Sequence, residues 1–153
     1  MSDPRPTGAE SIDDTLGGDH RRLGLLIDRL RAAAAERGPD AAAVLEEIGR
    51  ELGHHMAWEE QELFPAVRPH ATPVQEKHLQ SLEIDHERIR ETMADLRSAL
   101  ERRDFGAAGP VVERLDVFLK GHNADEEFGV YILADQVLDP AERRRLLEAF
   151  RGR

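Results

Sequence analysis

The stretch His54-His55-Met56-Ala57-Trp58-Glu59-Glu60 decides how the rest of the chain is interpreted, because it places an imidazole and a carboxylate four residues apart. Residues at this spacing lie one turn apart on the same face of an α-helix. A second copy, His122-Asn123-Ala124-Asp125-Glu126-Glu127, occurs towards the other end of the chain. The spacing alone is weak support for a site, so the interpretation depends on where the two copies lie in the predicted fold.

The composition restricts the class of protein and the kind of site. The chain has 153 residues, which suits one domain with its own core. Its formal net charge of −10 argues against nucleic acid or an anionic membrane as the partner. There is no cysteine, so any metal must be held by His and carboxylate side chains. With no signal-peptide or membrane-spanning pattern, we expect a cytoplasmic protein, with a monomer favoured.

Apolar residues recur at alternating spacings of three and four in four long segments, which is typical of helices packed in a bundle. Turn signals separate these segments at Gly38-Pro39, at residues 69–73 and at residues 104–110. No segment has the periodicity of a strand. We therefore predict an all-α fold, an up-down-up-down antiparallel four-helix bundle, with a short fifth helix beginning at Asp139-Pro140.

The predicted bundle spans residues 13–135. Residues 1–12 are polar and are predicted to form a flexible N-terminal segment, and residues 136–153 a C-terminal helix that docks on the bundle or extends from it. The second helix is predicted to run to about Val67, and the fourth to continue without a break through Leu133. Thr72 and Gln75 have the spacing of a capping box at the start of the third helix.

Each of the four long helices carries one histidine in its apolar seam. The points midway between successive histidines fall at residues 37–38, 70–71 and 104, and each of these lies in or beside a predicted turn. Residues equidistant from a turn lie at the same level of an antiparallel bundle, to within one helical turn of about 5 Å. We therefore expect four imidazoles in one layer of the core, from His20, His55, His86 and His122.

The two halves of the chain also resemble each other, since Asp19-His20 is repeated as Asp85-His86 and each half ends in His-x-x-x-Glu-Glu. The repeat places Glu59 and Glu126 in the same layer as the four imidazoles. A buried carboxylate without a partner is costly, and no Lys or Arg lies on a seam at that level, which disfavours a purely structural polar core. Two divalent cations would satisfy all six side chains, and the donor types suit iron, manganese or zinc.

The motifs, in the order His20, HHMAWEEQELFP, DHERI and GHNADEE, resemble the hemerythrin-like (HHE cation-binding) domain family over about residues 13–135. The resemblance implies a non-heme di-iron centre, oxo- or hydroxo-bridged, with manganese or zinc as less favoured metals. The ligands it implies are His20 and His55 for one iron, His86 and His122 for the other, and Glu59 and Glu126 as bridging carboxylates.

The chain departs from the oxygen-carrying hemerythrins at two positions. Those proteins have a further His one turn before the residue matching His86, where this chain has Leu82. They also have an Asp five residues after the last His, whereas here Glu126 is at four and Glu127 at five, so either glutamate could bridge. The resemblance therefore implies a centre that binds or reacts with oxygen, peroxide or nitric oxide. A catalase-like or nitric oxide reducing enzyme, a sensor and an iron store remain open.

Two further residues near the motifs have less certain roles. His54 precedes the seam histidine and is rotated by about 100° from it, so we expect it at the surface or at a helix interface. Tyr131 lies off the predicted seam, but its hydroxyl could donate a hydrogen or an electron at the centre. A histidine phosphotransfer bundle, which needs one exposed histidine, fits four seam histidines poorly.

Overall fold

The computed structural model of the protein describes residues 5–152, and within this range the chain is helical with no β-strand. The all-α prediction is therefore confirmed. The elements in chain order are η1 (Gly8–Glu10), α1 (Ile12–Ala35), α2 (Asp40–Trp58), η2 (Glu59–Leu63), α3 (Phe64–Val67), η3 (Arg68–His70), α4 (Pro73–Glu101), α5 (Phe105–Glu127), α6 (Val130–Val137) and α7 (Pro140–Arg151).

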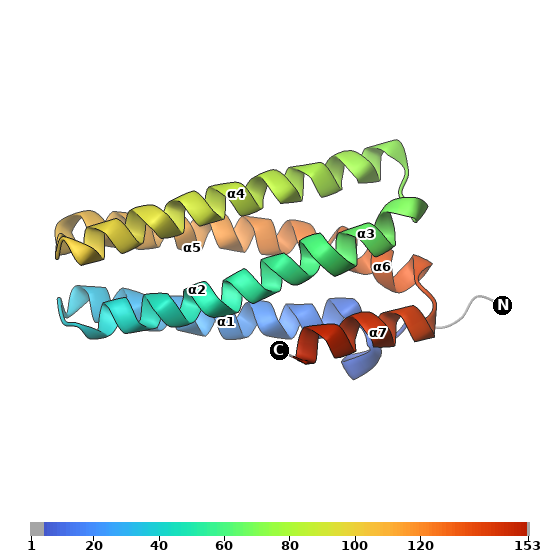
Figure 1. Ribbon diagram of the computed structural model, residues 1–153, viewed down its shortest axis with the longest axis horizontal. Helices are drawn as coiled ribbons and strands as arrows, with labels where there is room; N and C mark the ends of the chain where they lie inside the picture. The colour runs from blue at the N-terminus through green and yellow to red at the C-terminus, as the bar shows by residue number, and fades with distance from the viewer. Residues whose placement is uncertain (1–4, 153) are drawn as a thin grey trace.

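The four long helices lie side by side as a helical bundle (Figure 1). α1 packs against α2 and α5, and α4 packs against α5 and α2. The short helices α3, α6 and α7 gather at one end, and the turns after α1 and α4 lie at the other (Figure 1). Those two turns are alike, since Arg37 and Arg103 both have a left-handed backbone, with φ of 58° and 57°.

The core consists of two apolar clusters with a polar layer between them. Along α1 the chain passes from Leu16 in one cluster through His20 to Leu23 in the other, and α4 repeats this order. Because each histidine is flanked by buried leucine or isoleucine, its side chain is held inside the bundle and away from water. The residues of α4 in that order are Leu82, His86 and Ile89.

α1 begins at Ile12, one residue before the predicted start of the bundle. The Ser11 side chain accepts a hydrogen bond from the backbone N–H of Asp14 and so caps a helix that begins at Ile12. The carboxylate of Asp135 in α6 accepts hydrogen bonds from Ser11 Oγ (2.8 Å) and Ile12 N (2.8 Å). This buried contact ties down residues that the sequence assigns to the flexible segment; its residues 1–4 lie outside the described part of the chain.

The second predicted helix reaches Val67, but its path contains a π-helical segment, η2, beginning at Glu59. The backbone N–H of Phe64 donates to the carbonyl of Glu59 five residues back, instead of the usual four. Pro65 offers a cause, because proline has no N–H and its ring collides with the carbonyl four residues earlier. A wider turn relieves that collision, and π-bulges of this kind are frequent at functional sites.

The fourth predicted helix is broken into α5 and α6 at Phe128 and Gly129, so its predicted continuation through Leu133 is wrong. A Cβ atom at Gly129 would lie 2.3 Å from His78 Nε2 and 2.7 Å from the carbonyl oxygen of Asp125. Only glycine permits this close approach. The break changes which face of the following segment points inward, and Tyr131 is fully buried as a result.

The predicted fifth helix is present as α7, and the predicted capping box at Thr72 and Gln75 is formed. The indole N–H of Trp58 donates to the carbonyl of Leu146 at 2.8 Å, which fixes α7 against the end of α2. No helix in residues 5–152 is long and apolar enough to cross a membrane.

We expect Asp135→Ala to destabilise the protein by about 3 kcal/mol, because it leaves buried donors at the start of α1 without an acceptor. The control is Asp104→Ala, which removes an exposed cap that accepts one hydrogen bond from Ala107 N and is expected to cost about 1 kcal/mol. Urea unfolding of both variants measures the difference. Equal losses in the two variants would contradict the role assigned to Asp135.

Candidate metal centre

Six side chains from α1, α2, η2, α4 and α5 meet in the polar layer between the two apolar clusters. None of them is more than 6% exposed. The structure thus brings together all six residues singled out from the sequence. They are His20 in α1, His55 in α2, Glu59 at the start of η2, His86 in α4, and His122 and Glu126 in α5.

The Glu59 carboxylate lies between two imidazoles. Its Oε1 atom is 3.5 Å from His55 Nε2 and 3.3 Å from His86 Nε2. Its Oε2 atom accepts a hydrogen bond of 2.7 Å from the hydroxyl of Tyr131. Since Glu59 is fully buried, each of these contacts acts in a region from which water is largely excluded.

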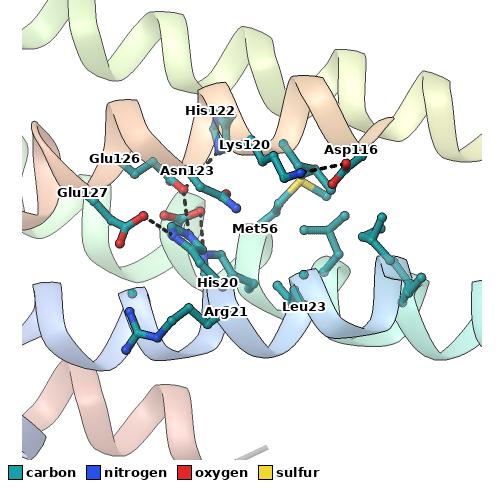
Figure 2. Close-up of a pocket in the computed structure, with 18 residues that line it drawn as sticks. His20, Arg21, Leu23, Met56, Asp116, Lys120, His122, Asn123, Glu126 and Glu127 are labelled. Carbon is teal, nitrogen blue, oxygen red and sulfur yellow. Dashed lines mark hydrogen bonds and ion pairs between the residues drawn. The ribbon is translucent and has the colours of Figure 1, made fainter. Parts of the chain in front are cut away.

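The Glu126 carboxylate occupies the matching position in the other half of the repeat. Its Oε1 atom is 3.2 Å from both His20 Nε2 and His122 Nε2. Figure 2 shows His20 pointing from α1 towards Glu126, with Glu127 on its outer side. Glu126 is therefore the glutamate that faces the core, and Glu127 is not.

Several buried polar atoms in this layer have no hydrogen-bond partner among the described residues. They are Glu59 Oε1, both carboxylate oxygens of Glu126, and His86 Nε2. Such atoms are costly to bury. Glu59 Oε1 and His86 Nε2 lie 3.3 Å apart, and cations bound between the carboxylates and the imidazoles would satisfy all of these atoms.

Each histidine also has a carboxylate on its outer nitrogen. His55 Nδ1 lies 2.7 Å from Asp19 Oδ2, and His122 Nδ1 lies 2.9 Å from Asp85 Oδ2. An Nδ1–H that donates outward leaves the lone pair of Nε2 directed inward, which is the tautomer that a metal ligand requires. Arg22 donates to Asp19 at 2.7 Å and helps to hold that carboxylate in place.

The other two histidines are held by glutamates. His86 Nδ1 lies 2.7 Å from Glu60 Oε1, and His20 Nδ1 lies 3.3 Å from Glu127 Oε2. Arg90 also donates to Glu60, at 2.8 and 3.1 Å.

The repeated doublets in the sequence therefore have a structural meaning. In each Asp-His pair the histidine points into the layer, while the aspartate holds a histidine of the neighbouring helix. In each Glu-Glu pair the first glutamate points inward and the second holds a histidine on another helix. The doublets are visible in the sequence, but the roles of their outer residues become apparent only from these contacts between helices.

Tyr131 faces the layer and is fully buried. The prediction that it lies off the seam is therefore wrong. Its hydroxyl lies 3.1 Å from His20 Nε2, 3.1 Å from His55 Nε2 and 2.7 Å from Glu59 Oε2. The break between α5 and α6 rotates it into the layer. Phe64 follows Glu59 by five residues, as Tyr131 follows Glu126, but it offers only a ring stacked on His86. The two halves of the layer therefore differ by one hydroxyl.

Two further positions are resolved by the structure. His54 lies at a helix interface, where its Nε2 is 2.9 Å from the carbonyl oxygen of Phe150 in α7, and so it takes no part in the layer. Leu82 is 1% exposed and packs in the apolar cluster one turn before His86. It places a hydrocarbon wall beside the layer where a further imidazole could otherwise lie.

Without a cation, protons on the imidazoles balance the two carboxylates. Burial alone would lower the pKa of His55, but the Glu59 charge and the contact with Asp19 raise it to about 10. Burial alone would also lower the pKa of His122, but the charge of Glu126 raises that pKa to about 9. Burial raises the pKa of Glu59, but the charge of His55 outweighs it and holds that pKa well below its usual value. A cation bound here would replace these protons.

The inward-facing atoms form two groups in which every donor lies within 4.8 Å of the others. One group contains His20, His55 and Glu126, and the other contains His86, His122, Glu59 and Glu126. Nitrogen and carboxylate donors at this spacing suit first-row transition metals. Because Glu126 belongs to both groups, the geometry fits two ions that share a carboxylate.

Comparison with known proteins agrees with this geometry. Residues 11–134 match the family model described as the hemerythrin HHE cation binding domain. No curated protein and no solved structure matched the chain.

We expect the stability of the metal-free protein to fall as the pH rises from about 6.5 to 10. The folded pKa values of His55 and His122 are raised above the ordinary 6.5, so their contribution is complete below pH 6.5 and is lost as the pH passes through 9 and 10. The lowered pKa of Glu59 acts oppositely, with its contribution lost as the pH falls below its ordinary value of 4.5.

Thermal unfolding in the presence of a chelator should therefore show an optimum between about pH 4.5 and 6.5. Metal affinity should rise over the range in which the metal-free protein weakens, because protons and metal compete for the same imidazoles. A melting temperature of the metal-free protein that stays constant from pH 6 to 10 would contradict the charge balance described above.

Proposed function

The chain belongs to the hemerythrin HHE cation-binding domain family, and we propose that it is a non-heme di-iron protein whose core binds or reacts with oxygen, peroxide or nitric oxide. The observation that carries the proposal is the set of unpartnered carboxylate oxygens of Glu59 and Glu126, buried among four imidazoles. A hydrogen-bonded structural core does not account for them. Two cations do.

In this proposal His20 and His55 bind one iron and His86 and His122 bind the other, with Glu59 and Glu126 as bridging carboxylates. The two donor groups described above divide the histidines in the same way. Glu59 faces His55 and His86, which belong to different groups, and this position favours a bridge. The up-down-up-down order of the four long helices is part of the proposal, because it is the order that brings the four histidines to one level.

Six inward-facing side chains are too many for one tetrahedral zinc ion, and the preference for iron over a pair of zinc ions rests on membership of the hemerythrin family. Manganese has similar donor preferences and is the closer alternative. When bound, a pair of iron ions supplies open coordination positions and two electrons for a small oxygen or nitrogen oxide ligand. The chain itself orients the imidazoles through Asp19, Glu60, Asp85 and Glu127, and the two apolar clusters flank the layer.

Tyr131 favours a second candidate function, an enzyme that reduces peroxide or nitric oxide at the same centre. A simple reversible carrier needs no proton donor of this kind inside the layer. The Tyr131 hydroxyl lies among His20, His55 and Glu59 and can deliver a proton there, while burial and the two glutamates raise its pKa well above 10. Turnover of peroxide by the iron-loaded protein, measured beside oxygen release at reduced oxygen pressure, separates the two functions.

We expect two equivalents of iron per chain after reconstitution with ferrous iron, and a change in the visible spectrum when air is admitted. His122→Ala should bind one equivalent, because it removes a donor from one group only. His54→Ala is the matched control: it alters a neighbouring imidazole that contacts Phe150 instead of the layer, and it should retain both. Less than one equivalent of metal in the unmodified protein would refute the proposal.

Tyr131→Phe should retain the fold but weaken binding of one of the two ions by about 10- to 100-fold, the usual effect of removing a group that orients a metal ligand. The affected ion is the one at His20 and His55, because the lost hydroxyl contacts both of them and Glu59. Competition titration with a chelator resolves the two affinities. Unchanged binding of both ions would show that the hydroxyl does not support the centre.

A further inference from the structure

A cavity of about 290 Å³ adjoins the polar layer between α1, α2 and α5. At one end it is lined by five of the six inward-facing side chains: His20, His55, Glu59, His122 and Glu126. Beyond them most of the wall is hydrocarbon, although Asn123 and Asp116 also belong to the lining. The side chains that form this apolar part are Leu23, Ile27, Ile48, Leu52, Met56 and Leu119.

The cavity opens to solvent along the groove between α1 and α5. Its lining includes Arg21, Gly24 and Lys120, all of which are exposed. Lys120 is paired with Asp116 at 2.9 Å, and Figure 2 shows this pair on the α5 side, away from the glutamates of the polar layer. The rim carries charges of both signs, since Glu127 also belongs to it, so it does not select for a charged ligand.

The opposite face of the bundle, between α4 and α2, lacks such an opening. Gly24 follows His20 by four residues, and the residue that follows His86 by four is Arg90. The Arg90 guanidinium lies across that face and donates to Glu60. A hollow between α2 and α4 is lined partly by Arg90, but none of the six inward-facing residues lines it. Among residues 5–152, the hollow between α1, α2 and α5 therefore reaches the layer, whereas the hollow between α2 and α4 does not.

Gly24 has no packing role that explains a glycine inside α1. A Cβ atom there would meet no heavy atom within 4 Å, so the bundle itself would accept a larger side chain. Glycine within a helix is destabilising relative to alanine. The open space beside Gly24 is the mouth of the cavity, and a side chain at this position would narrow it.

The size of the cavity exceeds what a diatomic ligand or peroxide needs. A water molecule accounts for about 30 Å³ of liquid, and a dry apolar cavity of about 150 Å³ in another protein binds benzene. By that comparison a cavity of 290 Å³ accommodates a molecule of about ten non-hydrogen atoms. The apolar walls favour hydrocarbon over water along most of this length.

We propose that this cavity binds a small, uncharged organic molecule with an apolar body and one oxygen-bearing end. The molecule enters between α1 and α5 past Gly24, its body lies against Leu23, Ile27 and Ile48, and its polar end points towards His55 and Glu59. The inference rests on the proposed function only for the presence of iron at the inner end. The substrate class of the centre then includes organic molecules, such as alcohols or organic hydroperoxides, besides diatomic ligands.

The test uses 1-hexanol as an unreactive probe, titrated into metal-free and iron-loaded protein. We expect saturable binding in both forms, with nuclear Overhauser contacts between the probe and the methyl groups of Leu23, Ile27 and Ile48. Gly24→Leu should weaken binding at least about tenfold, because its side chain fills the mouth of the cavity. Gly53→Leu is the matched control, since it adds the same side chain to open space on α2 away from this cavity.

Circular dichroism and iron content verify that Gly24→Leu keeps its fold and centre. If the branched side chain disturbs α1, the unbranched Gly24→Met provides the same comparison. Absence of probe contacts with these methyl groups, or equal binding by the Gly24 variants and the unmodified protein, overturns the inference. Probe binding to a protein that takes up no iron would refute the proposed function and leave the cavity assignment standing. Iron uptake without probe binding would overturn the cavity assignment and leave the proposed function standing.

Discussion

The burial of two carboxylates, Glu59 and Glu126, is the constraint on which the rest of the structure depends. Both groups are fully buried, and neither has enough hydrogen-bond donors to satisfy it. The fold meets this cost with four imidazoles, each directed inward by a carboxylate on its outer nitrogen. The apolar clusters on either side keep water out and so strengthen every charge interaction in the layer. A site of this kind is stable only when it is charged, by protons or by metal ions.

The sequence was sufficient to predict the six inward-facing residues because they obey the periodicity of straight helices. His55 and Glu59 lie one turn apart, and the turn positions bring His20, His86 and His122 to the same level without any knowledge of side-chain packing. The apolar seams also predicted the all-α fold. Helical periodicity relates two positions only where the helix between them is continuous.

The features that the sequence did not predict lie where a helix is interrupted. Tyr131 enters the layer because α5 ends at Glu127 and α6 begins only after Gly129. The helical periodicity of α5 therefore does not predict which residues of α6 point inward. Gly129 is visible in the sequence, but the need for glycine at this position comes from the close approach of His78, which lies in a distant segment of the chain. The same holds for the π-helical turn at Glu59. There the signal was Pro65, which a helix tolerates only by widening the preceding turn.

The internal repeat has a further consequence for the chemistry of the centre. The His-x-x-x-Glu-Glu motif occurs in both halves, so the residues within it make two similar groups of potential donors and do not distinguish one group from the other. The differences lie outside the motifs, at Tyr131 against Phe64 and at Gly24 against Arg90. One pair gives a hydroxyl to a single half, and the other opens a single face to solvent. Both departures fall on the same side, since Tyr131 contacts His20 and the open groove is lined by α1, which carries His20. In the proposed function, access and proton supply therefore converge on the donors His20 and His55, and this asymmetry distinguishes the two halves where the repeated motifs do not.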